Sequence, residues 1–324
     1  MPLINPYALT DQLLLAVLWG SWSSPPDRFS PRQKWRNQVQ RIIKDSVGAD
    51  RILSTGSWSH GTAISGFSDV DHFIVLSCER PNVSGEALER LFAPLSIALS
   101  SDTDVFLSSP TIGIVDPYDD RNVLEYVPAY VVGGGEYLIP DQASTEWLRS
   151  NPVAHAAFIN RADNRGRSVR EMIRLIKAWK YASGSELSSL YLEMVTTNYC
   201  LENPASHYLG ELIEILRTLK RLRLADIDDP SLMERRPLAS LASELSSKEA
   251  ALQLISTSLD KALRIEAAAK SGADGQVIAY TSELFDFSDA EKRFGSSHVM
   301  RTHQDPMRNR FTGLRQIRAA SKWR

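Results

Sequence analysis

The spacing of apolar residues changes near Trp147, and this change constrains the fold more than any other feature. Before Trp147, short runs rich in β-branched and aromatic residues predict strands at 51–54, 70–76, 111–115 and 123–132, after two helix-like stretches at 7–19 and 31–46. After Trp147, apolar residues recur every three or four positions and predict helices at 168–181, 190–201, 207–224, 238–245, 248–270 and 276–284. The pattern predicts an α+β protein in which a small mixed-sheet half precedes an all-helical half.

The length of 324 residues suits two domains, because a domain usually holds about 100 to 200 residues. We predict a first domain over 1–146 that includes the N-terminal helices, a helical domain over 147–295 and a basic tail over 296–324. Small molecules commonly bind where two domains meet. We therefore expect a cleft between the two halves.

Composition is that of an ordinary globular protein, with 43% hydrophobic and 23% charged residues. The apolar run at 13–19 is far shorter than the roughly 20 residues that cross a bilayer, and it lacks the pattern of a signal peptide. Cys78 and Cys200 have no metal-binding spacing, which favours buried free thiols in a reducing compartment. We expect a cytoplasmic protein with no membrane association and no zinc site.

The charge of the chain bears on nucleic acid as a partner. The formal net charge of -2 argues against binding through bulk electrostatics. Residues 292–324, however, carry nine Lys or Arg against one acid, Asp305. Two interpretations stay open for this segment: a solvated basic tail, or a local patch that holds a polyanion.

The stretch from Gly56 to Asp71 nearly matches a phosphate-binding motif. Gly56 and Gly61 have the spacing of a Walker A loop, but Thr62 stands where that loop requires lysine. Gly56 and Ser57 still offer an uncrowded backbone, open N–H groups and a hydroxyl to phosphate. Such a loop would need no lysine if a divalent metal neutralised the phosphates.

Two carboxylates close this stretch. Asp69 and Asp71 precede and enter a predicted strand, so their side chains project to the same side. Carboxylates one pleat apart raise each other's pKa unless a cation lies between them. Mg²⁺ suits such a pair, since it prefers oxygen ligands and keeps positions for water and substrate phosphates.

A third acid, Glu125, is alone in a predicted strand of apolar residues. An unpaired buried charge is costly, so a positive group should face it. Two interpretations stay open: an acid on an edge strand paired with an arginine, or a ligand of a metal site shared with Asp69 and Asp71.

The predicted helix over 168–181 opens with a capping box, Ser168 and Glu171, and Gly184 is a plausible stop. Its apolar stripe consists of Val169, Met172, Ile173 and Ile176, and a basic ridge on the opposite side consists of Arg170, Arg174 and Lys177. The ridge is either a solvated helix face or a wall of the cleft that grips phosphates.

The order of these features resembles the nucleotidyltransferase superfamily: Gly-Ser, about ten residues, Asp-x-Asp, and a third acid on a later strand. More narrowly the chain is similar to the CD-NTases, the bacterial relatives of cyclic GMP-AMP synthase and oligoadenylate synthetase. Four segments carry the narrower resemblance, at 56–71, 124–129, 139–152 and 172–179. The resemblance implies a polymerase β-like catalytic domain followed by a helical domain.

The resemblance also implies roles for individual residues. Asp69, Asp71 and Glu125 would be the catalytic ligands of two Mg²⁺ ions, for which Mn²⁺ could substitute. The predicted nucleotide-binding residues are Gly56, Ser57, Ser68, Lys177 and Ser189, and Tyr191 is a candidate for stacking on a base. Relatives usually have Asp in place of Glu125, whose extra methylene moves the carboxylate by about 1.5 Å.

The activity implied by the resemblance is two-metal nucleotidyl transfer between nucleoside triphosphates, ATP among them. Repetition within one product would give a cyclic di- or trinucleotide, a second messenger that acts on a downstream effector in the anti-phage defence called CBASS, with a regulatory protein as a further partner. The alternatives are a linear oligonucleotide, transfer of a nucleotide to RNA, a protein or a small molecule, and a catalytically silent nucleotide-binding scaffold.

Overall fold

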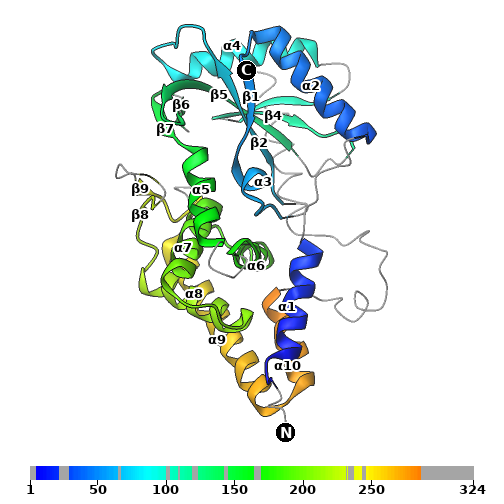
Figure 1. Cartoon of the computed structure of the whole chain (residues 1–324), viewed down its shortest axis with the longest axis vertical. Helices are drawn as coiled ribbons and strands as arrows, with labels where there is room; N and C mark the ends of the chain where they lie inside the picture. The colour runs from blue at the N-terminus through cyan, green and yellow to red at the C-terminus, as the bar shows by residue number, and fades with distance from the viewer. Residues whose placement is uncertain are drawn as a thin grey trace. The chain divides into compact units, whose positions relative to one another are not determined.

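A computed structural model describes residues 5–21, 29–64, 67–99, 103–108, 110–118, 123–141, 145–163, 169–230, 232, 237–242 and 246–285 (Figure 1). These residues lie in one compact unit that spans Met1–Asp286 and holds both halves. The predicted basic tail and Ser168 of the predicted capping box lie outside the described residues.

A mixed sheet forms the first half. Its strands lie in the order β1 (Arg51–Ser54), β2 (Val70–Leu76), β5 (Val123–Gly133), β4 (Thr111–Val115) and β3 (Val105–Ser108). Strands β2 and β5 are parallel, whereas β1–β2, β5–β4 and β4–β3 are antiparallel. Two further strands, β6 (Glu136–Pro140) and β7 (Trp147–Ser150), continue from the end of β5. The four predicted strands are confirmed, and β3, β6 and β7 are additions.

Side chains along β2 and β5 point alternately to the two faces of the sheet, and each face carries its own apolar cluster. One face, with Ile74 and Tyr126, packs under α2 (Pro31–Val47) and α4 (Ser84–Ala98), as Figure 1 shows. The opposite face carries Phe73, Val75, Val127 and Ala129. Because side chains alternate along a strand, Asp71 and Glu125 lie on this second face, opposite α2 and α4.

Helices build the second half: α5 (Pro152–Asp163), α6 (Val169–Ala182), α7 (Ser189–Glu202), α8 (Tyr208–Arg221), α9 (Lys248–Ser271) and α10 (Asp274–Phe285). Helix α1 (Ala8–Ser21), which the sequence assigned to the first domain, packs against α6, α8, α9 and α10. The predicted α+β architecture is confirmed. No helix among the described residues combines the length and hydropathy needed to cross a membrane.

Two sequence predictions are wrong in this half or beside it. The segment predicted as a helix at 238–245 pairs as strand in its described part: β9 (Pro237–Leu238) joins β8 (Ile227–Asp228), and Leu241 bridges to Leu187. The backbone of Ser240 is also engaged, because its carbonyl accepts from Ser188 N at 2.9 Å. The two cysteines are free, as predicted, but neither is buried, since Cys78 is exposed beyond the end of β2.

Candidate active site

A turn between β1 and α3 (Gly56–His60) presses Gly56 against Asp71. Thr55 N donates to Asp71 O at 2.9 Å, which joins the turn to the start of β2. Gly56 has φ +62°, and a Cβ atom at this position would overlap the Asp71 carboxylate. Both conditions require glycine, so this position needs an uncrowded backbone, as the sequence predicts.

Glu125 lies beside Asp71. The two residues are partners in the parallel β2–β5 register, so their side chains project from the same face. Strand β5 pairs with β2 on one side and β4 on the other, so it is central. The interpretation of Glu125 as an acid on an edge strand is therefore wrong.

The three acids act on one another. Burial raises the pKa of Asp71 well above its ordinary value, and the negative charges of Glu125 and then Asp69 raise it further. Lys177 opposes this effect but does not cancel it. Asp69, two residues before Asp71, and Glu125, from another strand, thus both lie within electrostatic reach of Asp71 at the start of β2.

The donor chemistry of this site suits a hard divalent cation, since three carboxylates repel one another until a positive charge joins them. Among the described residues, however, no three His, Cys, Asp or Glu side chains already stand in positions that could hold one metal ion. The site therefore suits a divalent cation by the type and charge of its donor groups.

The basic ridge of α6 binds the turn after α3. Arg170 Nε donates to His60 O at 2.7 Å, Arg174 Nη1 to Gly61 O at 3.1 Å, and Lys177 Nζ to Thr62 O at 3.0 Å. Three cations spaced along one helix face thus engage three successive carbonyls. Arg174 and Lys177 are buried, so the interpretation of the ridge as a solvated face is wrong.

Lys177 also forms a buried ion pair. Its Nζ lies 2.9 Å from Glu193 Oε1, and the two side chains are 1% and 3% exposed. Glu193 accepts further bonds from Thr62 Oγ1 at 2.7 Å and lies 3.0 Å from His60 Nδ1. Burial would raise the pKa of Glu193, but Lys177 and His60 outweigh it and hold that pKa below its ordinary value. The ammonium predicted to hold a triphosphate is thus already satisfied by protein groups, and a direct phosphate contact stays a prediction.

The sequence analysis did not predict that Glu193 and His60 belong to the site. Glu193 is an isolated acid in the apolar run 190–195, which is the same signal that identified Glu125. His60 carried no such signal, because its partner lies 133 positions later in the chain.

The remaining predicted nucleotide contacts fall into two places. Ser68 is buried, and its Oγ accepts a hydrogen bond from Ile64 N at 2.9 Å, which joins the two ends of the loop before Asp69. Ser57 is half-buried in α3. Ser189 begins α7, where its Oγ accepts from Lys180 Nζ at 2.8 Å. The suggestion that Tyr191 stacks on a base is wrong, because the ring is fully buried and its hydroxyl donates to Ala225 O at 3.0 Å.

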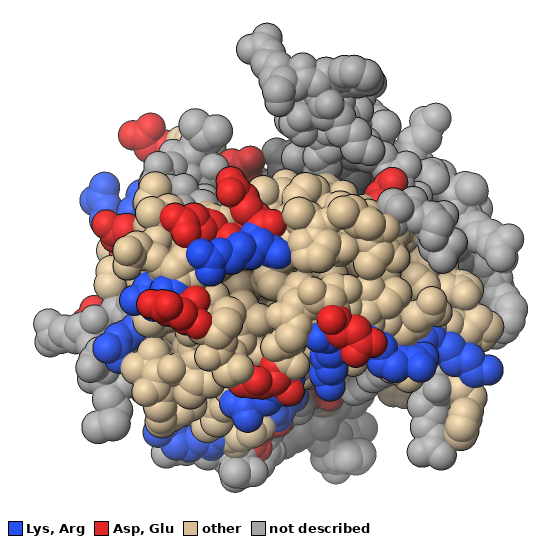
Figure 2. All heavy atoms as spheres, turned by 90° about the horizontal axis from the view of Figure 1, so that it is seen from above, with Lys and Arg blue, Asp and Glu red and all other residues tan. Residues whose placement is uncertain are grey.

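Two surface hollows occur elsewhere, of about 200 and 340 Å³, on the α7–α8 side of the helical half. None of the predicted site residues lines either hollow. On the face seen from above in Figure 2, the Lys and Arg side chains of the described residues lie among Asp and Glu side chains.

No protein-family model and no curated protein matches the chain. Solved structures do. CdnC of E. coli MS115-1 with ATP is 15% identical with a TM-score of 0.62, over 85% of this chain and 97% of that one. The CD-NTase CdnG of Bradyrhizobium diazoefficiens in complex with GTP is 17% identical with a TM-score of 0.60, over 86% and 99%. CdnE cyclic dinucleotide synthase of Elizabethkingia meningoseptica, with GTP and Apcpp, is 16% identical with a TM-score of 0.59, over 76% and 96%.

These matches define the class of the fold: a nucleotidyltransferase sheet joined to a helical half. More particularly, the chain has the fold of the CD-NTases over most of its length.

Proposed function

We propose that this protein is a nucleotidyltransferase that joins nucleoside triphosphates, ATP among them, into a cyclic di- or trinucleotide. The observation that carries the proposal is the sheet register that pairs Asp71 with Glu125, with Asp69 two residues away, beside a turn that only glycine can form. Further support comes from the fold, which is shared with structures solved with ATP and GTP and with a cyclic dinucleotide synthase.

The chemistry follows from the placement of the acids. A ribose hydroxyl would attack the α-phosphorus of a triphosphate, forming a P–O bond while the bond to the β-phosphate oxygen breaks and pyrophosphate leaves. Glu125, next to Asp71 in the sheet, would lie beside the attacking hydroxyl and take its proton. Asp69, Asp71 and Glu125 would hold two divalent cations, Mg²⁺ or Mn²⁺, which supply a lowered pKa for the hydroxyl and positive charge for the departing pyrophosphate.

Asp71 has a second role that its surroundings suggest. Its carboxylate fills the space beside Gly56, so the residue that holds cations also fixes the distance between β2 and the turn at Gly56 and Ser57. In the proposed enzyme this turn would present its backbone and the Ser57 hydroxyl to the phosphates.

The test is turnover with defined substrates. The purified protein, incubated with four radiolabelled nucleoside triphosphates and Mg²⁺ or Mn²⁺, should form a phosphatase-resistant product that mass spectrometry identifies as cyclic. Asp69→Ala should abolish product formation while leaving the melting temperature close to that of the wild type, because Asp69 is not part of the apolar core.

Other results would point elsewhere. A ladder that phosphatase degrades would replace ring closure with linear synthesis, and labelled RNA or protein would indicate a different acceptor. Nucleotide binding without turnover in either metal would favour the silent scaffold. A cyclic product would open the search for the effector and the regulatory protein that we propose in a cytoplasmic anti-phage system.

A further inference from the structure

Gly113 is a buried glycine in the middle of strand β4, and its own backbone does not require glycine. Glycine weakens the interior of a strand, and it often marks a bulge or a place where another group approaches closely. The register of β4 is regular on both sides, since Gly113 pairs with Phe106 of β3 and with Glu125 of β5. The φ of Gly113 lies outside the left-handed region. A close approach is therefore the reason for glycine at this position.

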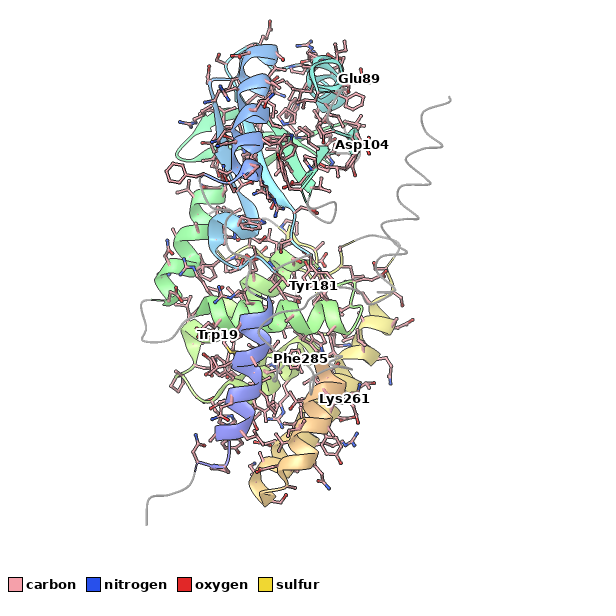
Figure 3. All side chains as sticks on the ribbon, turned by 90° about the vertical axis from the view of Figure 1, so that its right-hand side faces the viewer. Trp19, Glu89, Asp104, Tyr181, Lys261 and Phe285 are labelled. Carbon is pink, nitrogen blue, oxygen red and sulfur yellow. The ribbon has the colours of Figure 1, made fainter. Side chains whose placement is uncertain are left out.

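The group that approaches is the ring of Phe106. A Cβ atom on Gly113 would overlap the ring carbons Cζ, Cε1 and Cε2, so the far end of the ring lies directly over the glycine. Phe106 is half-buried and belongs to β3, which Asp104, labelled in the sheet half in Figure 3, directly precedes. The missing side chain of Gly113 thus lets an aromatic ring of β3 reach one strand further into the sheet, toward β5.

The ring lies in one row with two of the acids. Successive partners across β3, β4, β5 and β2 project from the same face of the sheet, and in this row they are Phe106, Gly113, Glu125 and Asp71. Helix α4 packs against β3 and β4 from the opposite face. Neighbouring strands lie about 5 Å apart, so the ring over Gly113 is about one strand spacing from the backbone of Glu125.

The surroundings of Glu125 limit where an attacking nucleotide can lie. In the proposed reaction, the ribose that carries the attacking hydroxyl is beside Glu125. On the Asp71 side lies the turn at Gly56, which the triphosphate of the other nucleotide would occupy. Along β5 the same face continues into the buried apolar cluster at Val127. The direction left for the base of the attacking nucleotide is toward β4 and β3, where Phe106 lies.

We propose that the Phe106 ring is the surface on which the base of the attacking nucleotide stacks. This inference rests on the proposed function and assigns a residue to the acceptor side of the same site. Gly113 would be a positioning residue, because its missing side chain holds the ring beside Glu125. Every base has a π-face, so the contact would strengthen binding by a factor of about 5 to 100 without choosing among the bases.

The test measures the donor and the acceptor separately. A 2′,3′-dideoxynucleoside triphosphate, labelled at the α-phosphate, can donate its nucleotide but has no hydroxyl with which to attack. An α,β-methylene nucleoside triphosphate has the hydroxyls but cannot donate, because a carbon replaces the oxygen of the bond that breaks. With Mg²⁺ or Mn²⁺ the wild type should join the two into a labelled dinucleotide and release pyrophosphate from the donor. Varying each substrate in turn gives its own KM.

Phe106→Leu keeps an apolar side chain and removes the aromatic surface. The KM for the methylene acceptor should rise about tenfold, whereas the KM for the dideoxy donor should stay at the wild-type value. Phe92→Leu is the matched control, since Phe92 is a half-buried phenylalanine of α4 on the opposite side of the sheet. It should leave both KM values unchanged.

Gly113→Ala displaces the ring without removing it. The strand backbone at Gly113 accommodates alanine, so the added methyl acts mainly on the Phe106 ring. The acceptor KM should rise as in Phe106→Leu, and the double variant should have about the acceptor KM of Phe106→Leu alone. A ring that only covers the glycine would lower the melting temperature of these variants and leave the ratio of the two KM values unchanged.

The outcomes separate the two proposals. A wild-type acceptor KM in Phe106→Leu and Gly113→Ala, or a rise in the donor KM alone, would overturn the role of Phe106 and leave the nucleotidyltransferase standing. If the wild type reacts only with natural triphosphates, product yields at limiting substrate supply the comparison, and equal yields from wild type and both variants would overturn that role. A wild type that forms no product from analogues or natural triphosphates would overturn both.

Discussion

At the scale of residues, the acids and the glycine beside them depend on one another. Asp69, Asp71, Glu125 and Gly56 could be proposed from the sequence because each breaks a local pattern. Two acids stand at the start of a strand, one acid stands in an apolar strand, and a glycine follows the end of another strand. The partners of Lys177, which are Thr62 and Glu193, could not be predicted, because they come together only in the folded chain.

Gly56→Ala tests the fit of the turn against Asp71. The left-handed backbone costs a residue with a side chain about 1–2 kcal/mol, and the added methyl would also displace the Asp71 carboxylate. We expect a lowered melting temperature and loss of most product formation. Gly272→Ala is the control, because Gly272 has φ +70° with open space around it and so shares only the backbone cost. Equal activity in the two variants would contradict the role of Gly56.

At the scale of elements, helix α6 connects the two halves of the chain. Its periodicity predicted the apolar stripe and the end near Gly184, where φ is +67°. The partner of the basic ridge could not be predicted, because the carbonyls of residues 60–62 come more than a hundred positions earlier. Backbone carbonyls leave no trace in a sequence pattern, whereas apolar stripes do. For the same reason the described part of 238–245 was mistaken for helix, since its pairing with distant segments decides its conformation.

Arg174→Met should loosen the turn after α3 without removing a predicted site residue. The amides of Gly61 and Thr62 donate to Trp58 O and Ser57 O. Loss of the hydrogen bond from Arg174 to Gly61 O should raise the hydrogen-exchange rate of these two amides by about tenfold. Hydrogen–deuterium exchange measures this directly. Arg221→Met, on the exposed end of α8, should leave those amides unchanged. Unchanged exchange in Arg174→Met would mean that the other two cations suffice.

At the scale of the whole molecule, Glu193 is the point where the sheet half and the helical half share one buried network. Glu193 lies on α7 and forms an ion pair with Lys177 of α6. It also accepts a hydrogen bond from the hydroxyl of Thr62, which follows α3. The broad division into a sheet half and a helical half could be predicted, because apolar periodicity is a local property. Their connection could not, because it depends on single polar residues far apart in the chain.

Glu193→Gln should lower the free energy of unfolding by about 3 to 5 kcal/mol, since it leaves Lys177 buried and uncompensated. The double variant Lys177→Met with Glu193→Met should cost less than the sum of the single changes. Urea denaturation measures each value. Additive losses would show that the pair is not coupled.

The same residue predicts a response to acid. The folded pKa of Glu193 lies below its unfolded value of about 4.3, so its contribution is complete above that pH and is lost as pH falls further. The difference in stability between wild type and Glu193→Gln should therefore shrink below about pH 4. A constant difference down to lower pH would contradict the pairing.

The packing of α1 has a practical consequence. The first described helix, α1, lies against α6, α8, α9 and α10, so the described part of the chain passes from the helical half through the sheet and back (Figure 1). A single cut near residue 147 would leave α1 on the wrong fragment and expose the surface of α6 that it covers. Anyone wishing to produce the sheet half by itself should begin after α1 and stop before α5. The helical half would need α1 reattached through a linker.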